Sequence, residues 1–127
     1  PLKFKTMKQT IMALFSCAFL LCSQTTFAQT KTTTSVVTDT ITISGNCGEC
    51  KSRIEDAAYV KGVKKANWDK KTKLLTVTYT AQKTNLSTIA SAIAKIGHDS
   101  RLATASDKNY NKLPNCCAYR NGKCHHE

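Results

Sequence analysis

The sequence lacks the residue arrangements on which most enzymes depend. Its 127 residues contain no Ser, His and Asp set that predicts a nucleophilic triad, and no paired carboxylates in a loop. No glycine-rich loop of the kind that cradles a phosphate is present either, and the chain has five glycines in all. We therefore expect a protein that is not an enzyme.

The sequence also lacks an apolar run long enough to span a bilayer, which takes about 20 residues. The longest run, residues 11–22, follows lysines at positions 3, 5 and 8 and precedes Thr26-Phe27-Ala28, whose small residues suit a signal peptidase. We predict a signal peptide at residues 1–28, cleaved near Ala28, hence an exported, periplasmic protein without a membrane span. Met7 is an alternative start. A lipid anchor on Cys17 is disfavoured, because it would leave a very short apolar core.

Acidic residues are scarce, with 8 Asp and Glu against 19 Lys and Arg and a formal net charge of +11. Such a balance often indicates nucleic-acid binding, but an exported chain rarely meets nucleic acid, so we expect none. Six lysines lie near a predicted strand and its turn: Lys61, Lys64, Lys65, Lys70, Lys71 and Lys73. They indicate a solvated sheet edge or a docking surface for an acidic partner.

Hydrophobic periodicity predicts a small α+β domain. Period-2 alternation indicates strands over residues 36–44, 63–68 and 74–80, and a last short strand over 101–104. Helical spacing indicates helices over 51–60 and 86–96, the second with Asn85 as its N-cap and Gly97 at its end. The order is that of the ferredoxin-like βαββαβ fold, an antiparallel sheet with both helices on one face.

These patterns divide the chain into four parts. After the signal peptide, residues 29–37 form a Thr-rich linker and residues 38–105 form the folded domain. Residues 106–127 are polar, rich in Cys and His, and without periodicity, so we interpret them as a tail rather than a further domain. Five of the seven cysteines lie beyond the leader, an odd number that does not fit a closed disulfide framework.

Cys47 and Cys50 form a Cys-x-x-Cys pair between the first predicted strand and the first predicted helix. A helix N-terminus lowers the pKa of a thiol, and thiolates bind soft ions such as Cu(I) or exchange with disulfides. The pair can therefore be interpreted as a soft-metal site, a redox site, or a plain disulfide. A redox site is disfavoured, because thioredoxin-like folds place a cis-proline opposite the cysteine pair. In this chain only Pro114 follows the leader, and it lies in the tail.

Residues 38–104 resemble the heavy-metal-associated domain family, small copper chaperones and metal-binding modules of soft-metal pumps and mercury scavengers. The resemblance rests on the Cys-x-x-Cys pair, the element order, and Ile96-Gly97-His98 before the last strand. Family members usually carry Gly-Met-x-Cys-x-x-Cys, whereas this chain has Ser44 and Gly45 at the first two positions. The family's methionine packs under the loop, so its loss implies a looser loop here.

The resemblance implies that His98 lies near the loop of Cys47 and Cys50. There it is either a further metal ligand or an uninvolved residue at a helix end. The tail holds Cys116, Cys117, Cys124, His125 and His126, whose density suits a second metal site. A Cys117–Cys124 disulfide is the alternative for the tail.

We therefore expect an exported protein that captures a soft ion on Cys47 and Cys50 and transfers or sequesters it by thiolate exchange. Cu(I) is the expected ion, with Hg(II) or Zn(II) as alternatives. The expected partner is a metal transporter or efflux component, and the chain is either a monomer or a metal-bridged dimer. A mercury-type periplasmic scavenger and a thiol-disulfide redox protein are the alternative functions.

Overall fold

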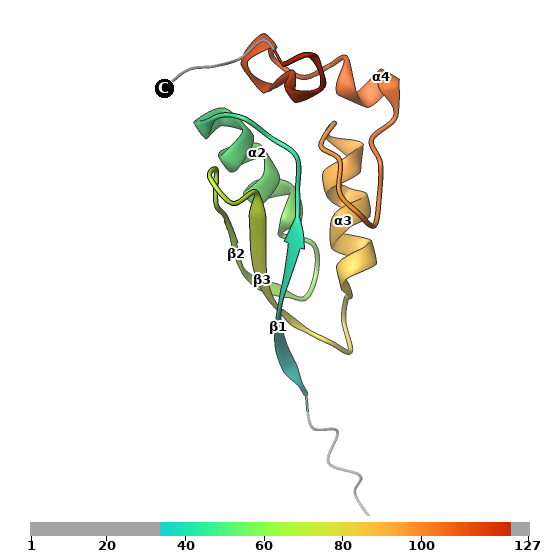
Figure 1. Ribbon diagram of the computed structural model, residues 1–127. Coiled ribbons are helices and arrows are strands. Elements are labelled where there is room, and N and C mark those ends of the chain that lie inside the picture. Colours follow the sequence, from blue (N-terminus) through green and yellow to red (C-terminus); the bar gives the residue numbers. More distant parts are fainter. Residues whose placement is uncertain (1–33, 123–127) are drawn as a thin grey trace, which may run out of the picture. The chain divides into compact units, whose positions relative to one another are not determined.

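The computed structural model describes residues 34–122. The predicted signal peptide, most of the linker, and Cys124, His125 and His126 lie outside this range. The elements are β1 (Val36–Thr42), α2 (Gly48–Ala58), β2 (Val63–Trp68), β3 (Leu74–Thr80), α3 (Leu86–Lys95) and α4 (Asp107–Tyr110) (Figure 1). Two short 3-10 turns follow, η1 (Asn115–Cys117) and η2 (Tyr119–Asn121). No helix among the described residues is long and apolar enough to cross a membrane.

The three strands form one antiparallel sheet in the order β1-β3-β2. Ile41 of β1 lies opposite Leu75, and Ala66 of β2 lies opposite Val77. Alternate residues of the central strand are buried, so a single face of the sheet carries the core. The helices supply Ile54, Ile89 and Ile93 to the same core, and this confirms the predicted ferredoxin-like α+β fold.

The predicted last strand over residues 101–104 is wrong. One isolated antiparallel bridge joins Ser100 to Ile43, and a tight turn follows it. The Ser100 backbone N–H donates to the carbonyl of Ala103 (2.8 Å), and its side-chain oxygen accepts from the N–H groups of Leu102 and Ala103. Because these backbone groups bond within the turn, they are not available to extend a ladder along β1.

The other element boundaries shift by a few residues. The first strand ends at Thr42 rather than Ser44, and the first helix spans Gly48–Ala58 rather than residues 51–60. Asn85 caps α3 as predicted, because its side chain accepts from the N–H of Thr88 (2.9 Å). Gly97 ends this helix with a φ of +102°, a left-handed conformation that favours glycine.

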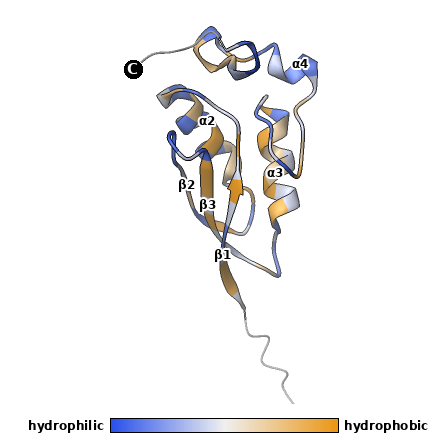
Figure 2. Ribbon diagram, viewed as in Figure 1, coloured by the Kyte–Doolittle hydropathy of each residue, from blue (hydrophilic) through white to orange (hydrophobic). Residues whose placement is uncertain are grey.

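The tail is not the patternless appendage that the sequence indicates. It forms α4, η1 and η2, which lie over the ends of α2 and α3 (Figure 1). Most of its side chains are hydrophilic, as the colouring of α4 shows in Figure 2, yet Tyr110, Leu113 and Cys117 are buried in the hydrophobic core. These few buried residues give the tail a fixed place on the domain, whose predicted boundaries at 38 and 105 stay predictions.

Candidate metal centre

The metal loop, residues 44–50, runs from the end of β1 into the first turn of α2. It places two sulfur atoms next to backbone N–H groups. Cys47 is the N-cap of α2, and its Sγ accepts from the N–H of Cys50 (3.3 Å). The Sγ of Cys50 accepts from the N–H of Asn46 (3.3 Å). These donors and the positive end of the helix dipole stabilise negative charge on sulfur. The loop therefore favours thiolates, the form that binds metal.

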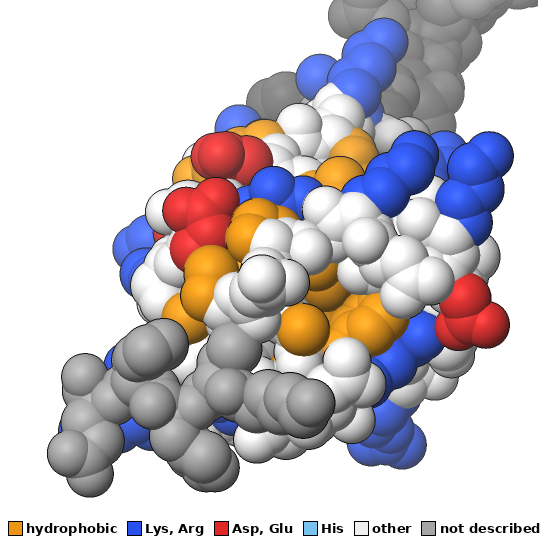
Figure 3. Space-filling view, turned by 90° about the horizontal axis from the view of Figure 1, so that it is seen from above, with side chains coloured by type: hydrophobic (Ala, Val, Ile, Leu, Met, Phe, Trp, Pro, Cys, Tyr) orange, Lys and Arg blue, Asp and Glu red, His pale blue; other side chains and the backbone are white. Residues whose placement is uncertain are grey.

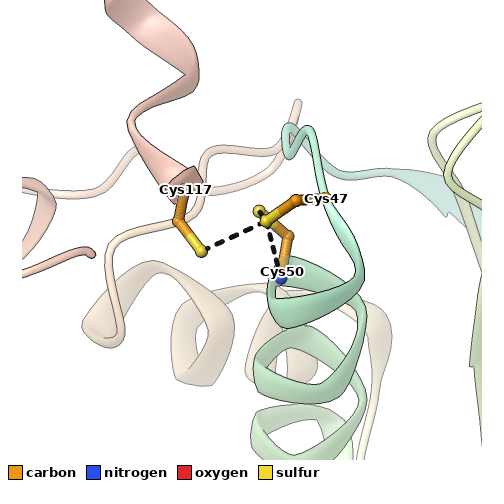
Figure 4. A group of neighbouring side chains, drawn as sticks. All are labelled: Cys47, Cys50 and Cys117. Atoms are coloured by element: carbon orange, nitrogen blue, oxygen red, sulfur yellow. Dashed lines mark hydrogen bonds between the residues drawn. The ribbon is translucent and has the colours of Figure 1, made fainter. Parts of the chain in front are cut away.

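Three thiols from two distant parts of the chain meet at this loop (Figure 4). The Sγ of Cys47 lies 3.1 Å from that of Cys50 and 3.5 Å from that of Cys117, on η1. All three sulfurs lie within 4.8 Å of one another, an arrangement that could hold a metal ion. We call Cys47, Cys50 and Cys117 the three-thiol group.

The cysteines of the described residues are free thiols, namely Cys47, Cys50, Cys116 and Cys117. The Cys117–Cys124 disulfide, the alternative for the tail, is therefore wrong, because Cys117 faces the metal loop as a thiol. Cys116 lies beside the three-thiol group, with its Sγ 3.9 Å from that of Cys117. Cys124, His125 and His126 lie outside the described residues, so a second site that includes them stays a prediction.

The three thiols differ in how readily they lose a proton. Burial raises the pKa of Cys47, but hydrogen bonds from Cys50, Cys117 and Cys116 outweigh burial and hold the pKa below its usual value. Burial raises the pKa of Cys50 above the usual value. It raises the pKa of Cys117 further, together with the neighbouring thiols of Cys50 and Cys47. Cys47 thus ionises first, and a cation is needed to balance further thiolates at this place.

His98 does not belong to the three-thiol group. Its side chain is fully buried, and its Nδ1 lies 2.8 Å from the carbonyl oxygen of Ser44, at the start of the metal loop. Because a carbonyl oxygen only accepts, Nδ1 carries the proton, and burial lowers the pKa of the ring so that it stays neutral. Its Nε2 is buried without a hydrogen-bond partner among the described residues. The structure therefore places His98 beneath the loop as a support for Ser44.

The Trp68 ring packs against Gly45, the position at which the family carries methionine. A Cβ built at Gly45 would lie 3.1 Å from the Trp68 ring and 3.1 Å from the Cβ of Cys50. The ring is fully buried, and its Nε1–H donates to the carbonyl of Ile43 (3.1 Å). An indole from β2 therefore packs under the loop, and the expected looser loop stays a prediction.

An arginine at the end of the tail fastens it to the domain. The Arg120 guanidinium donates two hydrogen bonds to the carboxylate of Asp99, at 2.9 and 2.8 Å, and one to the carbonyl of Ala105 at 2.8 Å. It also lies over the ring of Tyr110, with 4.3 Å from Cζ to the ring centroid. The planar guanidinium contacts the Asp99 carboxylate through two parallel hydrogen bonds, so it fixes the orientation of the two groups as well as their distance. A lysine would not fix the orientation.

Two aromatic rings, those of buried Tyr110 and half-buried Tyr119, continue this attachment. The Tyr119 hydroxyl donates to the carbonyl of Gly97 (2.9 Å) and accepts from the N–H of Asp99 (2.8 Å). Its ring stacks on His98 and meets Tyr110 edge-on, at centroid distances of 5.6 and 5.2 Å. We call Tyr110, Tyr119, Arg120 and Asp99 the tail clamp. It connects the tail to the helix end that also supports the metal loop.

Comparisons with known proteins match part of the chain. Residues 40–99 match the heavy-metal-associated domain family. No curated protein has a sequence that matches the chain. Three solved structures resemble parts of it. The first is the Cu(I)-loaded N-terminal domain of a potential copper-translocating P-type ATPase from Bacillus subtilis, with 25% identity, a TM-score of 0.50, and coverage of 57% of this chain and 94% of that one.

The second solved structure is a putative copper-ion-binding protein from Bacillus anthracis str. Ames, with 23% identity, a TM-score of 0.51, and coverage of 54% and 99%. It is similar in fold. The third is oxidized MerP from Ralstonia metallidurans CH34, with 28% identity, a TM-score of 0.49, and coverage of 52% and 94%. Each likeness covers little more than half of this chain.

Proposed function

We propose, from the premise that residues 40–99 form a heavy-metal-associated domain, that this protein captures Cu(I) on Cys47 and Cys50 and passes it to a protein partner. One observation carries the proposal: two free thiols lie 3.1 Å apart at the N-terminus of a helix, each supported by a backbone N–H. Thiolates are soft ligands that select soft ions, and Cu(I) is such an ion. The likeness to a Cu(I)-loaded domain supports the choice of metal.

The mechanism follows from the different exposure of the two thiols. Cys47 is half-buried and has the lower pKa, whereas Cys50 is fully buried. The ion therefore meets Cys47 first and then gains Cys50, whose proton is released as the ion binds. Transfer is the reverse process, in which a thiolate of the partner replaces these ligands one at a time, so that the ion is never free.

The rest of the proposal concerns where the protein acts and which partner receives the ion. The predicted leader at residues 1–28 supports export, and a metal transporter or efflux component is the partner that such an ion carrier would serve. Figure 3 views the end of the molecule that carries the tail, where apolar side chains lie near the middle and both basic and acidic side chains lie around them. The Lys and Arg side chains of this surface suit acidic groups of a partner.

Titration of the reduced full chain with Cu(I), Hg(II) and Zn(II) against a competing chelator tests the proposal. We expect Cu(I) to bind more tightly than Zn(II), and the Cys47→Ser and Cys50→Ser variants to lose tight binding. Cys116→Ser is the matched control, because it removes a neighbouring thiol outside the three-thiol group. Tight Cu(I) binding that survives in the Cys47→Ser/Cys50→Ser double variant would contradict the proposal.

A further inference from the structure

We infer that Cys117 supplies a third thiolate to the ion held by Cys47 and Cys50, so that the tail closes the metal site with an internal ligand. The inference rests on the proposed function and deepens it. Under this inference the tail is not a separate site. The tail instead supplies one ligand that converts an open two-thiolate site into a three-thiolate site. Cu(I) is the soft ion that we expect this site to bind.

The distances between the sulfurs favour three ligands over two. With metal–sulfur bonds of about 2.3 Å, sulfurs lie about 4.6 Å apart in a linear site and about 4.0 Å apart in a trigonal one. The observed separations are 3.1 Å between Cys47 and Cys50 and 3.5 Å between Cys47 and Cys117. The trigonal site therefore needs the smaller adjustment of the Cys47–Cys50 pair, and the Cys47–Cys117 distance is close to the trigonal value. The Cys117 side chain already points at Cys47 (Figure 4).

The position of Cys117 is fixed by contacts that do not involve a metal. The tail clamp holds η2 through the Arg120–Asp99 pair and through the Tyr119 hydroxyl, which bonds to Gly97 and Asp99. On the other side of Cys117, Leu113 packs against Gly97, where a Cβ would come within 2.9 Å of the leucine Cγ. A ligand arm that is already in place binds at a low cost in conformational entropy.

The surroundings of Cys117 also suit a ligand. Its side chain is fully buried, and its sulfur lies within 4.8 Å of the sulfurs of Cys47 and Cys50. Three sulfur atoms gathered at one place are soft ligands that suit a soft cation. Cys116 differs in being half-buried and in lying outside the three-thiol group, although it is adjacent in sequence.

A third internal ligand changes how the ion leaves. The thiol of an incoming partner binds the metal as a thiolate and gives its proton to the departing Cys117, which becomes a thiol again. The metal–sulfur bond to Cys117 breaks as the bond to the partner forms, and no electron is transferred. Because Cys117 belongs to the tail and not to the sheet, it can move away without opening the β1–β3 ladder. The tail therefore slows release to weak competitors and yields to a thiol partner.

X-ray absorption at the copper edge of the fully reduced, Cu(I)-loaded full chain tests the inference without any substitution. We expect three sulfur neighbours at the length typical of three-coordinate Cu(I). Two sulfur neighbours at the shorter, two-coordinate length would overturn the inference and leave the proposed function in place. Failure of the full chain to bind Cu(I) at all would instead overturn the proposed function.

Variants add a second readout. Cys117→Ser should reduce the copper coordination to two sulfurs, speed Cu(I) transfer to a competing chelator, and weaken affinity about tenfold or more, since even an outer-shell partner is worth that much. Cys116→Ser keeps a hydroxyl group that can donate a hydrogen bond, and it should keep the three sulfur neighbours of the wild type. Cys117→Ala, with circular dichroism to check the fold, covers the case in which the buried serine destabilises the domain. Equal coordination in Cys117→Ala and the wild type, or an effect of Cys116→Ser alone, would contradict the inference.

Discussion

Arg120→Ala should detach the tail from the domain and lower the stability of the whole fold. The substitution removes the two hydrogen bonds to the Asp99 carboxylate, the bond to the Ala105 carbonyl, and the contact with the Tyr110 ring. The ion pair with Asp107 counts for little, since the Asp107 side chain is 92% exposed. The Arg120 and Asp99 side chains are 27% and 22% exposed, so their pair is only partly screened by solvent.

The magnitude follows from these contacts. The partly buried two-pronged pair contributes about 1.5 kcal/mol, the bond to the carbonyl about 1 kcal/mol, and the ring contact about 0.5 kcal/mol. The free energy of unfolding should therefore fall by about 3 kcal/mol, a large fraction of the 5–15 kcal/mol or so of a typical domain. For a domain of this size the midpoint of thermal unfolding should fall by roughly 10–20 °C. Arg120→Lys keeps the charge but loses the two-pronged geometry, so it should recover less than half of the loss.

Two assays separate local from global effects. Urea unfolding followed by Trp68 fluorescence reports the global free energy, and mass spectrometry of alkylated cysteines reports how often the buried thiol of Cys117 becomes exposed. In Arg120→Ala we expect faster alkylation of Cys117 as well as the lower midpoint. A loss below about 1 kcal/mol together with unchanged alkylation of Cys117 would refute the role of the tail clamp.

Three further predictions concern the supports of the loop and the clamp. His98→Ala should weaken Cu(I) binding by at most about tenfold, or about 1.4 kcal/mol, in a chelator competition, because the ring positions the loop rather than the ion. Burial raises the pKa of Asp99, but hydrogen bonds outweigh burial and hold the pKa below its usual value. The ionised carboxylate therefore adds stability above about pH 4, and this stability is lost as the pH falls further. The urea midpoints of the wild type and Asp99→Asn should therefore converge in acid. Gly45→Met, which restores the family residue, should collide with Trp68 and lower the free energy of unfolding by about 1–3 kcal/mol in urea.

The sequence was sufficient to predict the sheet, the two long helices and the Cys-x-x-Cys loop, because each depends on local pattern. Leu75, Val77 and Tyr79 alternate, and Asn85 caps a helix whose apolar residues recur on one face. The last strand failed for a local reason that periodicity does not report, namely the turn that the side chain of Ser100 closes. No hydrophobic period distinguishes these four residues from a strand.

The place of the tail could not be predicted, since it depends on contacts between residues far apart in a polar segment. Cys117 meets Cys47 across 70 positions, and Arg120 meets Asp99 across 21. The available signal was composition, namely the Cys and His residues clustered at positions 116–126. That composition indicated metal binding but not which site the thiols join. The position of Trp68 under Gly45 likewise depends on the packing of β2 against the loop.

The central claim is that Cys47 and Cys50 hold a soft metal ion, and one measurement tests it most directly. The reduced full chain and its Cys47→Ser/Cys50→Ser double variant are titrated with Cu(I) in the presence of a chelator of known affinity. We predict that the wild type removes one equivalent of Cu(I) from the chelator and that the double variant, still folded by circular dichroism, removes none. Equal removal of Cu(I) by the two proteins would contradict the account.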